Sequence, residues 1–490
     1  MGKTSKNALG GSVDGLVAFV KKDCPTCELV EPVLGELQAI AAAGGTPITI
    51  VTQDDPTFPA LDDVVFDEDL SLSWHANVDT VPTLDRMGNG LSADRVVGWS
   101  RNEWSALTGI ETLGADLPDH RPGCGSLSVD PEHAERLEVH FGESGLVSRR
   151  VEFGDLEDHV EAMFDRGWSD GLPLVAPTEV RVQRMLEGTT RSPDDIVCIV
   201  PPDLVEVTVE KVAINAVMAG CRPEYLPVVL AGLEAVCTDE FNMHGVLATT
   251  MPVGPIFIVN GPIADAIGMN AGINALGHGN RANATIGRAV QLVIRNVGGG
   301  APGGVDQAAH GNPGKLGMCF PEREADSPWG PLSVDRGFAS GQNTVTAFAG
   351  EAPRILFDQL SRTPESLTAS LAESLKATIS PRLAMMFDAV LVLCPEHAAR
   401  YADAGWTKER FLAELHQHLE LDADEILRGT NGIAEGIPEE FAGTKLPKFN
   451  PDGGLMIVHA GGDAGLFSSV MGGWVNGATG SVPVTKEIIA

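Results

Sequence analysis

Two cysteines separated by two residues stand near the start of the chain, in the stretch CPTC from Cys24 to Cys27. Apolar residues at helical spacing follow them, from Leu29 to Ile40. A thiol in the first turn of a helix faces free backbone N–H groups and the positive end of the helix dipole, which favours the thiolate. A thiolate attacks disulfides, and a cysteine one turn later resolves the mixed disulfide. The spacing therefore predicts a redox pair, with Cys24 as nucleophile and Cys27 as resolving thiol.

Metal binding is the main alternative for this pair. A structural zinc site needs two further ligands at suitable spacing, and the chain contains no second CxxC. Cys319 stands close to two glutamates in the sequence, but its spacing to them and to the histidines matches no known ligand motif. We therefore expect no metal and no cofactor beyond a redox-active disulfide.

The elements around the cysteines follow a recognisable order. Residues 15–20, GLVAFV, form an apolar run typical of a buried parallel strand, and the helix after Cys27 ends near Gly44 and Gly45. Residues 46–51 predict a second strand, residues 80–99 a β-hairpin around Gly-Asn-Gly, and residues 101–113 a helix. The first part of the chain is therefore predicted to be a βαβ unit followed by a hairpin and a helix.

Residues 15–112 resemble the thioredoxin family. The likeness rests on the strand LVAFV, the CPTC stretch, Pro32 within the following helix, and Pro82 in TVPT, where the family places a cis-proline facing the two cysteines. Ala18 stands where the family has a buried Asp, and Asp23 replaces the usual aromatic residue before the first cysteine. The resemblance implies a thioredoxin-like fold with Cys24, Cys27 and Pro82 at its redox site; a redox-inactive docking domain is the alternative.

A composition change after residue 113 predicts a domain boundary. Residues 114–123, GADLPDHRPG, have the Pro, Gly and Asp content of a linker. Beyond it, predicted helices alternate with short apolar runs that end in Gly, Pro or Asn, as strands do at a ligand-binding sheet edge. We therefore expect an α/β protein with a thioredoxin-like domain at 1–113, a linker at 114–123, and a larger α/β domain with a mixed sheet at 124–490, with room for two subdomains.

Cys124 is the downstream cysteine with the least side-chain cover, because glycines flank it in RPGCGS. A linker of this length lets Cys124 meet Cys24 within one chain at high effective concentration. The alternative is a thiol in a surface turn.

Polar residues beside predicted strands and helices of the larger domain suggest a substrate site. His244 and Thr249 precede a predicted strand that ends at Asn260, and Asn283 or Thr285 is expected to cap a helix. Arginines beside that helix N-terminus could hold a carboxylate or phosphate, although pairing of Arg288 with a carboxylate is at least as common. The predicted substrate-binding residues are His244, Thr249, Asn260, Arg281, Asn283, Arg288 and Cys319.

The larger domain also resembles a family of uncharacterised bacterial proteins. The stretches that carry the likeness are GWSDGLPLVAPT, NGPIADAIGMNAG, GNRANATIGRAV, CPEHAARYADAGWTKE and GSVPVTKEI. That family is associated with selenoproteins bearing a Sec-Gly-Ser-Cys motif, and Cys124-Gly125-Ser126-Leu127 is similar to it. The resemblance implies that Cys124 takes the selenocysteine place as reactive centre, with Leu127 in the place of the last cysteine. The CxxC pair would then supply the resolving thiol.

Composition excludes several classes of partner. The 490 residues carry a net charge of −33, which repels nucleic acid and anionic membranes. We find no apolar run long enough to span a membrane, and no signal peptide at the N-terminus. Eight cysteines in this length do not form a disulfide scaffold, so a cytoplasmic chain with reduced thiols is expected. A homo-oligomer stays compatible with the sequence.

These observations together suggest a thiol-dependent oxidoreductase. Substrate, a small and anionic molecule, would bind in the larger domain, where Cys124 attacks it or is oxidised. Cys24 and Cys27 would then reduce the product, and a cellular thiol reductant would regenerate the pair. Two alternatives stay open: a lyase or hydrolase whose catalytic cysteine the thioredoxin-like domain keeps reduced, and a non-catalytic redox sensor or chaperone.

Overall fold

The computed structural model of the protein describes residues 14–88, 91–142, 145–154, 157–427 and 439–489. The chain divides into two compact units, residues 1–145 and 146–490. Both units combine helices with mixed sheets, so the protein is of the α/β class, as the sequence predicts. None of the described helices is long and apolar enough to cross a membrane.

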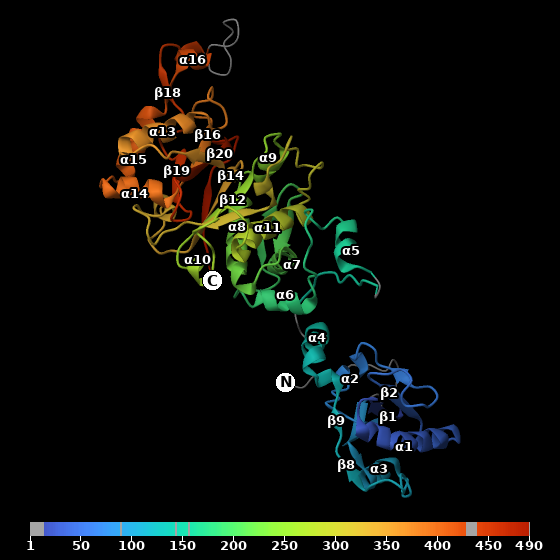
Figure 1. Ribbon diagram of the computed structural model, residues 1–490. Helices are drawn as coiled ribbons and strands as arrows, with labels where there is room; N and C mark the ends of the chain where they lie inside the picture. The colour runs from blue at the N-terminus through green and yellow to red at the C-terminus, as the bar shows by residue number, and fades with distance from the viewer. Residues whose placement is uncertain (1–13, 89–90, 143–144, 155–156, 428–438, 490) are drawn as a thin grey trace. The chain divides into compact units, whose positions relative to one another are not determined.

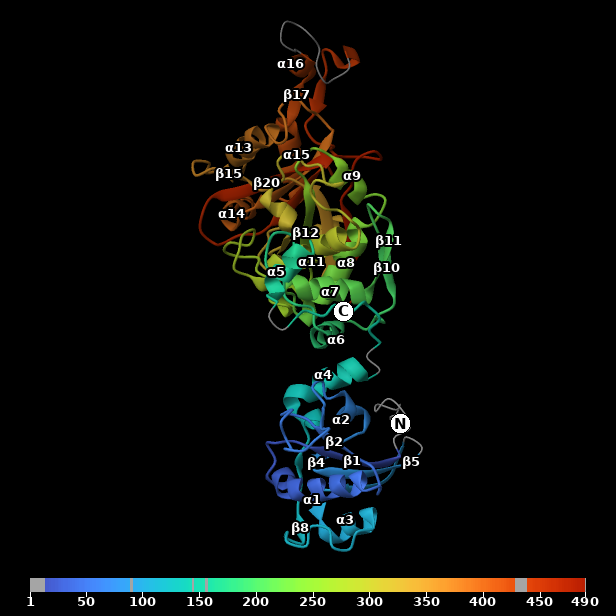
Figure 2. The same ribbon diagram turned by 90° about the vertical axis from the view of Figure 1, so that its right-hand side faces the viewer.

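The first unit is built on a five-stranded sheet of order β3-β2-β1-β5-β6. β1 pairs with β2 in parallel and with β5 in antiparallel orientation, so the sheet is mixed. Figures 1 and 2 show α1 and α3 on one side of this sheet and α2 on the other. The elements are β1 (Gly15–Val20), α1 (Pro25–Ala42), β2 (Ile48–Thr52), β3 (Val65–Phe66), α2 (Ser71–His75), β4 (Thr80–Val81), β5 (Thr83–Gly88), β6 (Leu91–Val97), β7 (Trp99–Ser100), α3 (Arg101–Thr108), β8 (His120–Arg121), β9 (Cys124–Gly125), the 3-10 helix η1 (Leu127–Val129) and α4 (Pro131–Phe141).

Local sequence explains the elements that carry the cysteines. All residues of β1 are buried, which matches its uninterrupted apolar run. α1 starts at Pro25, whose missing N–H is not needed in the first turn, and its apolar stripe packs on the sheet. The predicted strand at 15–20, the CxxC helix, the second strand and the β5–β6 hairpin are confirmed, although the hairpin tip at residues 89–90 lies outside the described residues.

The predicted linker at 114–123 is wrong, because this segment packs into the first unit. Leu113 is fully buried, and Gly114 lies so close to Trp99 that a Cβ there would come within 2.6 Å of the indole. The indole Nε1 of Trp99 donates to the carbonyl oxygen of Pro118 at 2.7 Å. β8 then pairs with β7, and β9 pairs with β4. The boundary between the units therefore falls at residues 145/146, and Cys124 belongs to the first unit.

The second unit contains an eight-stranded sheet of order β13-β12-β14-β20-β16-β19, in which β15 also pairs with β20 and β21 with β14. The sheet folds over so that Ile258 and Phe320 from one half share an apolar cluster with Val392 and Val458 from the other. Its two edges meet where the backbone N–H of Arg323 donates to the carbonyl oxygen of His459 at 2.7 Å. The strand ends of the two halves therefore come together at one place.

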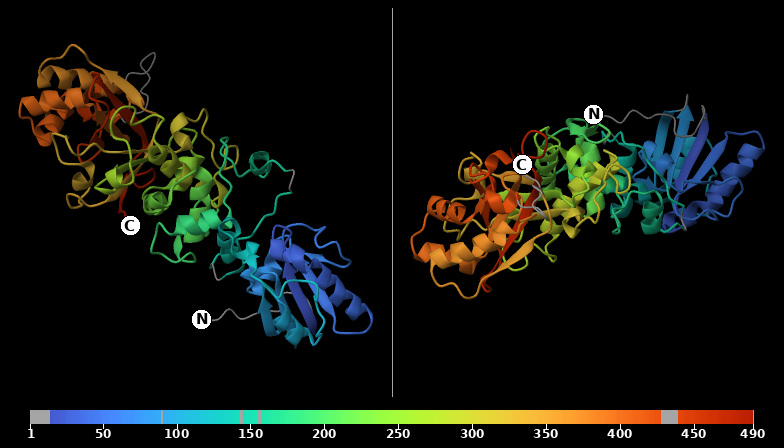
Figure 3. Two further views of the ribbon diagram at one scale, coloured as in Figure 1. Left: turned by 60° about the horizontal axis from the view of Figure 1, so that its bottom comes forward. Right: turned by 90° about the horizontal axis from the view of Figure 1, so that it is seen from above.

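Helices cover both outer faces of this folded sheet. One apolar cluster joins α7, α8 and α11 to β12 and β14, and another joins α13, α14 and α15 to β15, β16, β19 and β20. Figure 3 shows the red strands near the C-terminus between these two groups of helices. The helices are α5 (His159–Asp165), α6 (Glu179–Leu186), α7 (Val209–Ala219), η2 (Pro223–Tyr225), α8 (Leu226–Val236), α9 (Met243–Ala248), α10 (Ile263–Ala266), α11 (Arg281–Asn296), η3 (Pro313–Leu316), α12 (Leu332–Asp335), α13 (Pro364–Lys376), α14 (Pro395–Asp403), α15 (Lys408–His418), α16 (Ala423–Leu427) and η5 (Glu439–Phe441).

The strands of the second unit follow the apolar runs of the sequence. Those predicted from DIVCIVPP, GPIFIVNGP, AVLVLCPE and GLMIVHAGG are confirmed as β10, β12, β16 and β19, but β10 is only partly buried because it pairs with β11 alone. The strands are β10 (Ile196–Val200), β11 (Val205–Thr208), β12 (Gly254–Asn260), β13 (Met318–Pro321), β14 (Thr344–Gly350), β15 (Arg354–Phe357), β16 (Phe387–Leu393), β17 (Glu420–Asp422), β18 (Lys445–Pro447), β19 (Leu455–His459), β20 (Phe467–Val475) and β21 (Val484–Glu487).

The packing of residues 114–123 can be tested with two fragments. A fragment of residues 1–145 should unfold cooperatively, whereas residues 1–113 should melt at least roughly 10 °C lower, because Trp99 loses its cover and its hydrogen-bond acceptor. Thermal unfolding followed by near-ultraviolet circular dichroism measures both midpoints. Equal midpoints would mean that residues 114–145 add nothing to the fold of the first unit.

Candidate functional site

The two cysteines of the CPTC stretch lie where β1 meets α1. Cys24 is the N-cap of α1, and its sulfur accepts a hydrogen bond from the backbone N–H of Cys27 at 3.2 Å. The turn before it is held by Asp54, whose carboxylate accepts from the backbone N–H groups of Lys22 and Asp23 at 2.7 and 2.9 Å. The Cys24 sulfur therefore sits at the helix N-terminus expected from the sequence.

Backbone pairing brings Cys124 to the same place. β9 pairs with β4 in antiparallel register, with Cys124 opposite Val81 and Gly125 opposite Thr80. The sulfur of Cys24 lies 3.5 Å from the carbonyl oxygen of Val81, to which it donates only in its protonated form, so both cysteines lie beside the same residue. Cys124 packs against the buried cluster that contains Cys24 and Cys27, and it is among the groups that lower the pKa of Cys24. The structure thus joins Cys24, Cys27 and Cys124 into one cluster within the first unit.

Two further contacts hold the segment that carries Cys124. The hydroxyl of Thr26, inside the CPTC stretch, donates to the carbonyl oxygen of Pro122 at 2.7 Å. A Cβ on Gly123 would come within 2.4 Å of the Thr80 side chain and 2.8 Å of the Val81 carbonyl oxygen, so only glycine fits without a shift. The glycine before Cys124 is therefore needed for close packing, in addition to leaving the thiol uncovered.

A buried polar network anchors the residues after Cys124. Ser126 accepts a hydrogen bond from the Gln53 side-chain amide at 2.7 Å, and its backbone N–H donates to Asp79. The Gln53 carbonyl oxygen accepts from the backbone N–H of Leu127 at 3.1 Å. Ser126 of the Cys-Gly-Ser-Leu stretch therefore has a positioning role, and Leu127 offers no second thiol.

The three thiols differ in acidity. A hydrogen bond from Cys27 lowers the pKa of Cys24 to about 6; burial opposes this, and a hydrogen bond from Cys124 adds to it. Burial raises the pKa of Cys27 far above its ordinary value, and its hydrogen bond to Cys24 acts in the same direction. Burial and the hydrogen bond to Cys24 also raise the pKa of Cys124. At neutral pH the cluster therefore holds one thiolate, on Cys24, with two thiol donors beside it.

Solvent reaches only one of the three. Cys24 is 1% exposed and Cys27 is fully buried, whereas Cys124 is partly exposed. An external molecule can therefore reach Cys124 directly, whereas Cys24 and Cys27 are enclosed. The bond between Val81 and Pro82 is cis, which matches the place that the sequence assigns to Pro82.

The predicted substrate-binding residues of the second unit do not form one site. His244 is exposed on α9, and the Thr249 hydroxyl accepts from the backbone N–H of Met251. Asn260 is fully buried at the end of β12, beside two glutamates. Cys319 is buried in β13, and burial raises its pKa to a value unsuited to a nucleophile.

The predicted arginine pocket is occupied by the protein itself. Arg288 forms a two-pronged ion pair with Asp170, at 2.7 and 2.8 Å, which is the alternative that the sequence left open. Arg281 donates to the carbonyl oxygens of Gly220 and Cys221. The prediction that Asn283 or Thr285 caps this helix is wrong: Asn280 caps it, and Asn283 is buried against the backbone of Asn270 and Ala275.

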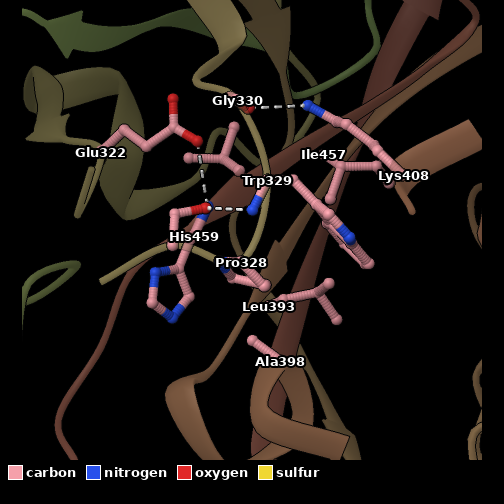
Figure 4. A pocket seen from close by; sticks show the side chains of 11 residues that line it. Glu322, Pro328, Trp329, Gly330, Leu393, Ala398, Lys408, Ile457 and His459 are labelled. Atoms are coloured by element: carbon pink, nitrogen blue, oxygen red, sulfur yellow. Dashed lines mark hydrogen bonds between the residues drawn. The ribbon is translucent and has the colours of Figure 1, made fainter. Parts of the chain in front are cut away.

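Sequence reasoning does not single out other polar side chains of the second unit. Cys394 occupies the N-cap position of α14 without a side-chain capping bond. Burial raises the pKa of its thiol, but interactions with His397 and Ser468 outweigh this and leave that pKa below its ordinary value. The C-x-x-H spacing at the start of a helix is the signal that could have found it. Glu322, Lys408 and His459 line a pocket (Figure 4), and nothing in their spacing indicates it. Within the described residues, no group of three or more His, Cys, Asp or Glu side chains could hold a metal ion.

Comparisons of the chain with protein-family models, with curated proteins and with solved structures find no match. A function for the thiol cluster is therefore inferred from its geometry and from the sequence.

The acidity of Cys24 gives a pH prediction. Alkylation of Cys24 by iodoacetamide, followed by peptide mass spectrometry, should rise with a midpoint near pH 6, because the thiolate is the reacting form. Cys27→Ala should raise the midpoint more than Cys124→Ala, since the Cys27 hydrogen bond is the larger cause. A midpoint near the ordinary cysteine value of about 8.5 in the unmodified protein would contradict this account.

The cover over Cys24 gives a second prediction. Thr26→Val removes the hydrogen bond to Pro122 without changing the size of the side chain, so the Cys124 segment should open more often. We expect the alkylation rate of Cys24 to rise roughly five- to tenfold at fixed pH. Thr108→Val is the matched control, because Thr108 bonds to the carbonyl of Trp104 in the same unit, away from the cysteines. An equal change in both variants would show a general loss of stability.

Proposed function

We propose that the first unit is a thiol–disulfide oxidoreductase in which Cys124 receives the substrate sulfur and the Cys24–Cys27 pair reduces it. The observation that carries this proposal is the β4–β9 pairing, which places Cys124 opposite Val81, beside Cys24 and against the cluster that contains both cysteines of the pair. The resemblance of residues 15–112 to the thioredoxin family, with cis Pro82 beside the cysteines, supports the same reaction class.

The reaction begins at the partly exposed thiol. Cys124 loses its proton and attacks one sulfur of a disulfide substrate; this forms a mixed disulfide and releases the first half of the substrate as a thiol. The thiolate of Cys24 then attacks the Cys124 sulfur, forms a Cys24–Cys124 disulfide and releases the second half. Cys24 suits this step because it is ionised at neutral pH and already lies beside Cys124.

The second exchange frees Cys124 for another cycle. Cys27 attacks the Cys24 sulfur, its proton passes to the departing Cys124 sulfur, and a Cys24–Cys27 disulfide remains. The substrate disulfide has gained two electrons, and the Cys24–Cys27 pair has lost two electrons and the proton of Cys27. The second half of the substrate leaves as a thiolate and takes its proton from solvent. A cellular thiol reductant returns the pair to the dithiol by the reverse route. Cys124 attacks the Cys24–Cys27 disulfide to form the Cys24–Cys124 disulfide, and the reductant then attacks the partly exposed Cys124 sulfur.

This scheme changes one part of the hypothesis drawn from the sequence. Cys124 was expected in the larger domain, beside a substrate bound there, whereas it shares the first unit with its reductant. The transfer from Cys24 to Cys124 therefore needs no movement between domains. A small anionic disulfide, or a thiol adduct on Cys124, stays the proposed substrate.

The decisive experiment traps the intermediate between Cys24 and Cys124. In Cys27→Ala the Cys24–Cys124 disulfide cannot be resolved, so mild oxidation with a small disulfide should accumulate it in most molecules. Non-reducing peptide mass spectrometry identifies the link. Multiple turnover of the disulfide with an added dithiol reductant should fall at least roughly 100-fold in the same variant, because the resolving thiol is missing.

Cys319→Ala is the matched control, because it removes a buried thiol of the other unit and should leave both readouts unchanged. Recovery of Cys24 linked only to small thiol or to another cysteine would overturn the proposed route. Full turnover in Cys124→Ala would likewise remove Cys124 from the reaction.

A further inference from the structure

Two cysteines of the second unit can be reached from solvent. Cys198 lies in β10, and Cys237 directly follows the last residue of α8. Both thiols are partly exposed, whereas the other cysteines of this unit, Cys221, Cys319 and Cys394, are buried. A small reagent can therefore react with Cys198 and Cys237 without first opening the fold.

Cys198 lies on the face of β10 that packs toward the helices. In the antiparallel pairing of β10 with β11, Cys198 is opposite Val207, which is fully buried. Val200, two residues further along β10, is fully buried as well. Side chains two residues apart share one face of a strand, so Cys198 points with these valines toward the apolar cluster that contains most of α8. Figure 2 shows the β10–β11 hairpin next to α8, which packs against β10.

An arginine determines which parts of β10 and α8 face one another. The backbone N–H of Cys237 still donates to a helix carbonyl oxygen, at 3.1 Å, so Cys237 lies on the same helix face as Glu234, three residues before it. The guanidinium of Arg191 donates to the carboxylate of Glu234 at 2.8 Å and to the carbonyl oxygen of Ile196 at 3.1 Å. One side chain thus joins the α8 face that carries Cys237 to the point of β10 two residues before Cys198.

The acidity of Cys237 agrees with this placement. The side chain of Cys198 raises the pKa of Cys237 far above its ordinary value, and burial adds to the effect. An effect larger than that of burial requires the two side chains to lie close together. Cys237 therefore keeps its proton at neutral pH, which suits a thiol that acts second in an exchange.

We propose that Cys198 and Cys237 form a second redox-active dithiol, which small disulfides oxidise to a Cys198–Cys237 disulfide. Cys198, as a thiolate, attacks one sulfur of the small disulfide, forms a mixed disulfide and releases the first half. Cys237 then loses its proton, attacks the Cys198 sulfur and releases the second half. The two cysteines together lose two electrons and two protons, and the small disulfide becomes two thiols.

This disulfide ties a hairpin to the helical layer. Among the described strands, β10 and β11 pair only with one another, and a two-stranded hairpin is marginally stable by itself. A crosslink from β10 to α8 restricts opening of the hairpin. The oxidised state therefore holds β10 on the helices more firmly than the reduced state does.

Mild oxidation of the full-length protein tests the pair. The probe is bis(2-hydroxyethyl) disulfide, and non-reducing peptide mass spectrometry identifies the link. The variant Cys24→Ser/Cys27→Ser/Cys124→Ser removes the thiols of the first unit, so the result is independent of the function proposed for them. We expect a Cys198–Cys237 link in most molecules of this variant and of the unmodified protein, and a dithiol reductant should reverse it.

Backbone hydrogen exchange measures the effect of the crosslink. Amides of β10 and β11 should exchange at least roughly tenfold more slowly in the oxidised than in the reduced protein. Cys237→Ser leaves only a mixed disulfide on Cys198, so oxidation should not slow exchange in this variant. Cys319→Ala is the matched control, because it removes a buried thiol of the same unit and should behave as the unmodified protein does.

The proposal fails on any of three results: no Cys198–Cys237 link after oxidation, a link from either cysteine to a different one as the main product, or equal exchange of β10 in both redox states. If Cys237→Ser fails to fold, mass spectrometry and hydrogen exchange of the unmodified protein decide alone.

Discussion

Pairing of two residues of β9 with two residues of β4 is the constraint on which the thiol cluster depends. It places Cys124 opposite Val81, whose carbonyl oxygen lies 3.5 Å from the Cys24 sulfur. Thr26 and Gly123 make this approach close, one by a hydrogen bond to Pro122 and one by the absence of a Cβ. Without the pairing, the Cys24 sulfur would still lie at the helix N-terminus beside Cys27. It would lose the neighbouring Cys124 thiol, which helps to lower the pKa of Cys24.

The second unit depends on a different constraint, the folding of one sheet over itself. Each half brings its own helical layer, and a shared apolar cluster fills the space between the halves. Glu322 closes the junction, because its carboxylate accepts from the backbone of His459 and Leu332 and from the amide of Asn260. Loss of these three donors would leave a buried carboxylate without hydrogen bonds, which costs free energy of folding. The arrangement of residues at this junction is therefore strongly specified.

Local sequence patterns predicted the elements that local interactions form. The apolar run of β1, the spacing of α1 and the Gly-Asn-Gly hairpin each reflect contacts between near neighbours. β8 and β9 were missed because each is two residues long and lies in a stretch with the composition of a linker. Their hydrogen-bond partners are distant in the chain, so no periodicity within the segment marks them.

The same distinction applies to side-chain sites. Cys24 and Cys27 are one helical turn apart, so their proximity follows from the sequence. The pairing of Arg288 with Asp170, and the meeting of Lys408 with His459 at one pocket, depend on how whole elements pack. Asn260 was predicted to bind substrate because of its place at a strand end. It does lie at the junction beside Glu322, where its side-chain amide donates to the Glu322 carboxylate and so supports the junction.

Enclosure of the Cys24 sulfur has a consequence for damage by oxidants. A low-pKa thiolate is the form that peroxides convert to sulfenic and then, irreversibly, to sulfinic acid. In this protein the acidic sulfur is 1% exposed, and the sulfur that solvent reaches has a raised pKa. Reactivity and accessibility are thus divided between two neighbouring thiols, so Cys24 is shielded from irreversible oxidation while it stays ionised.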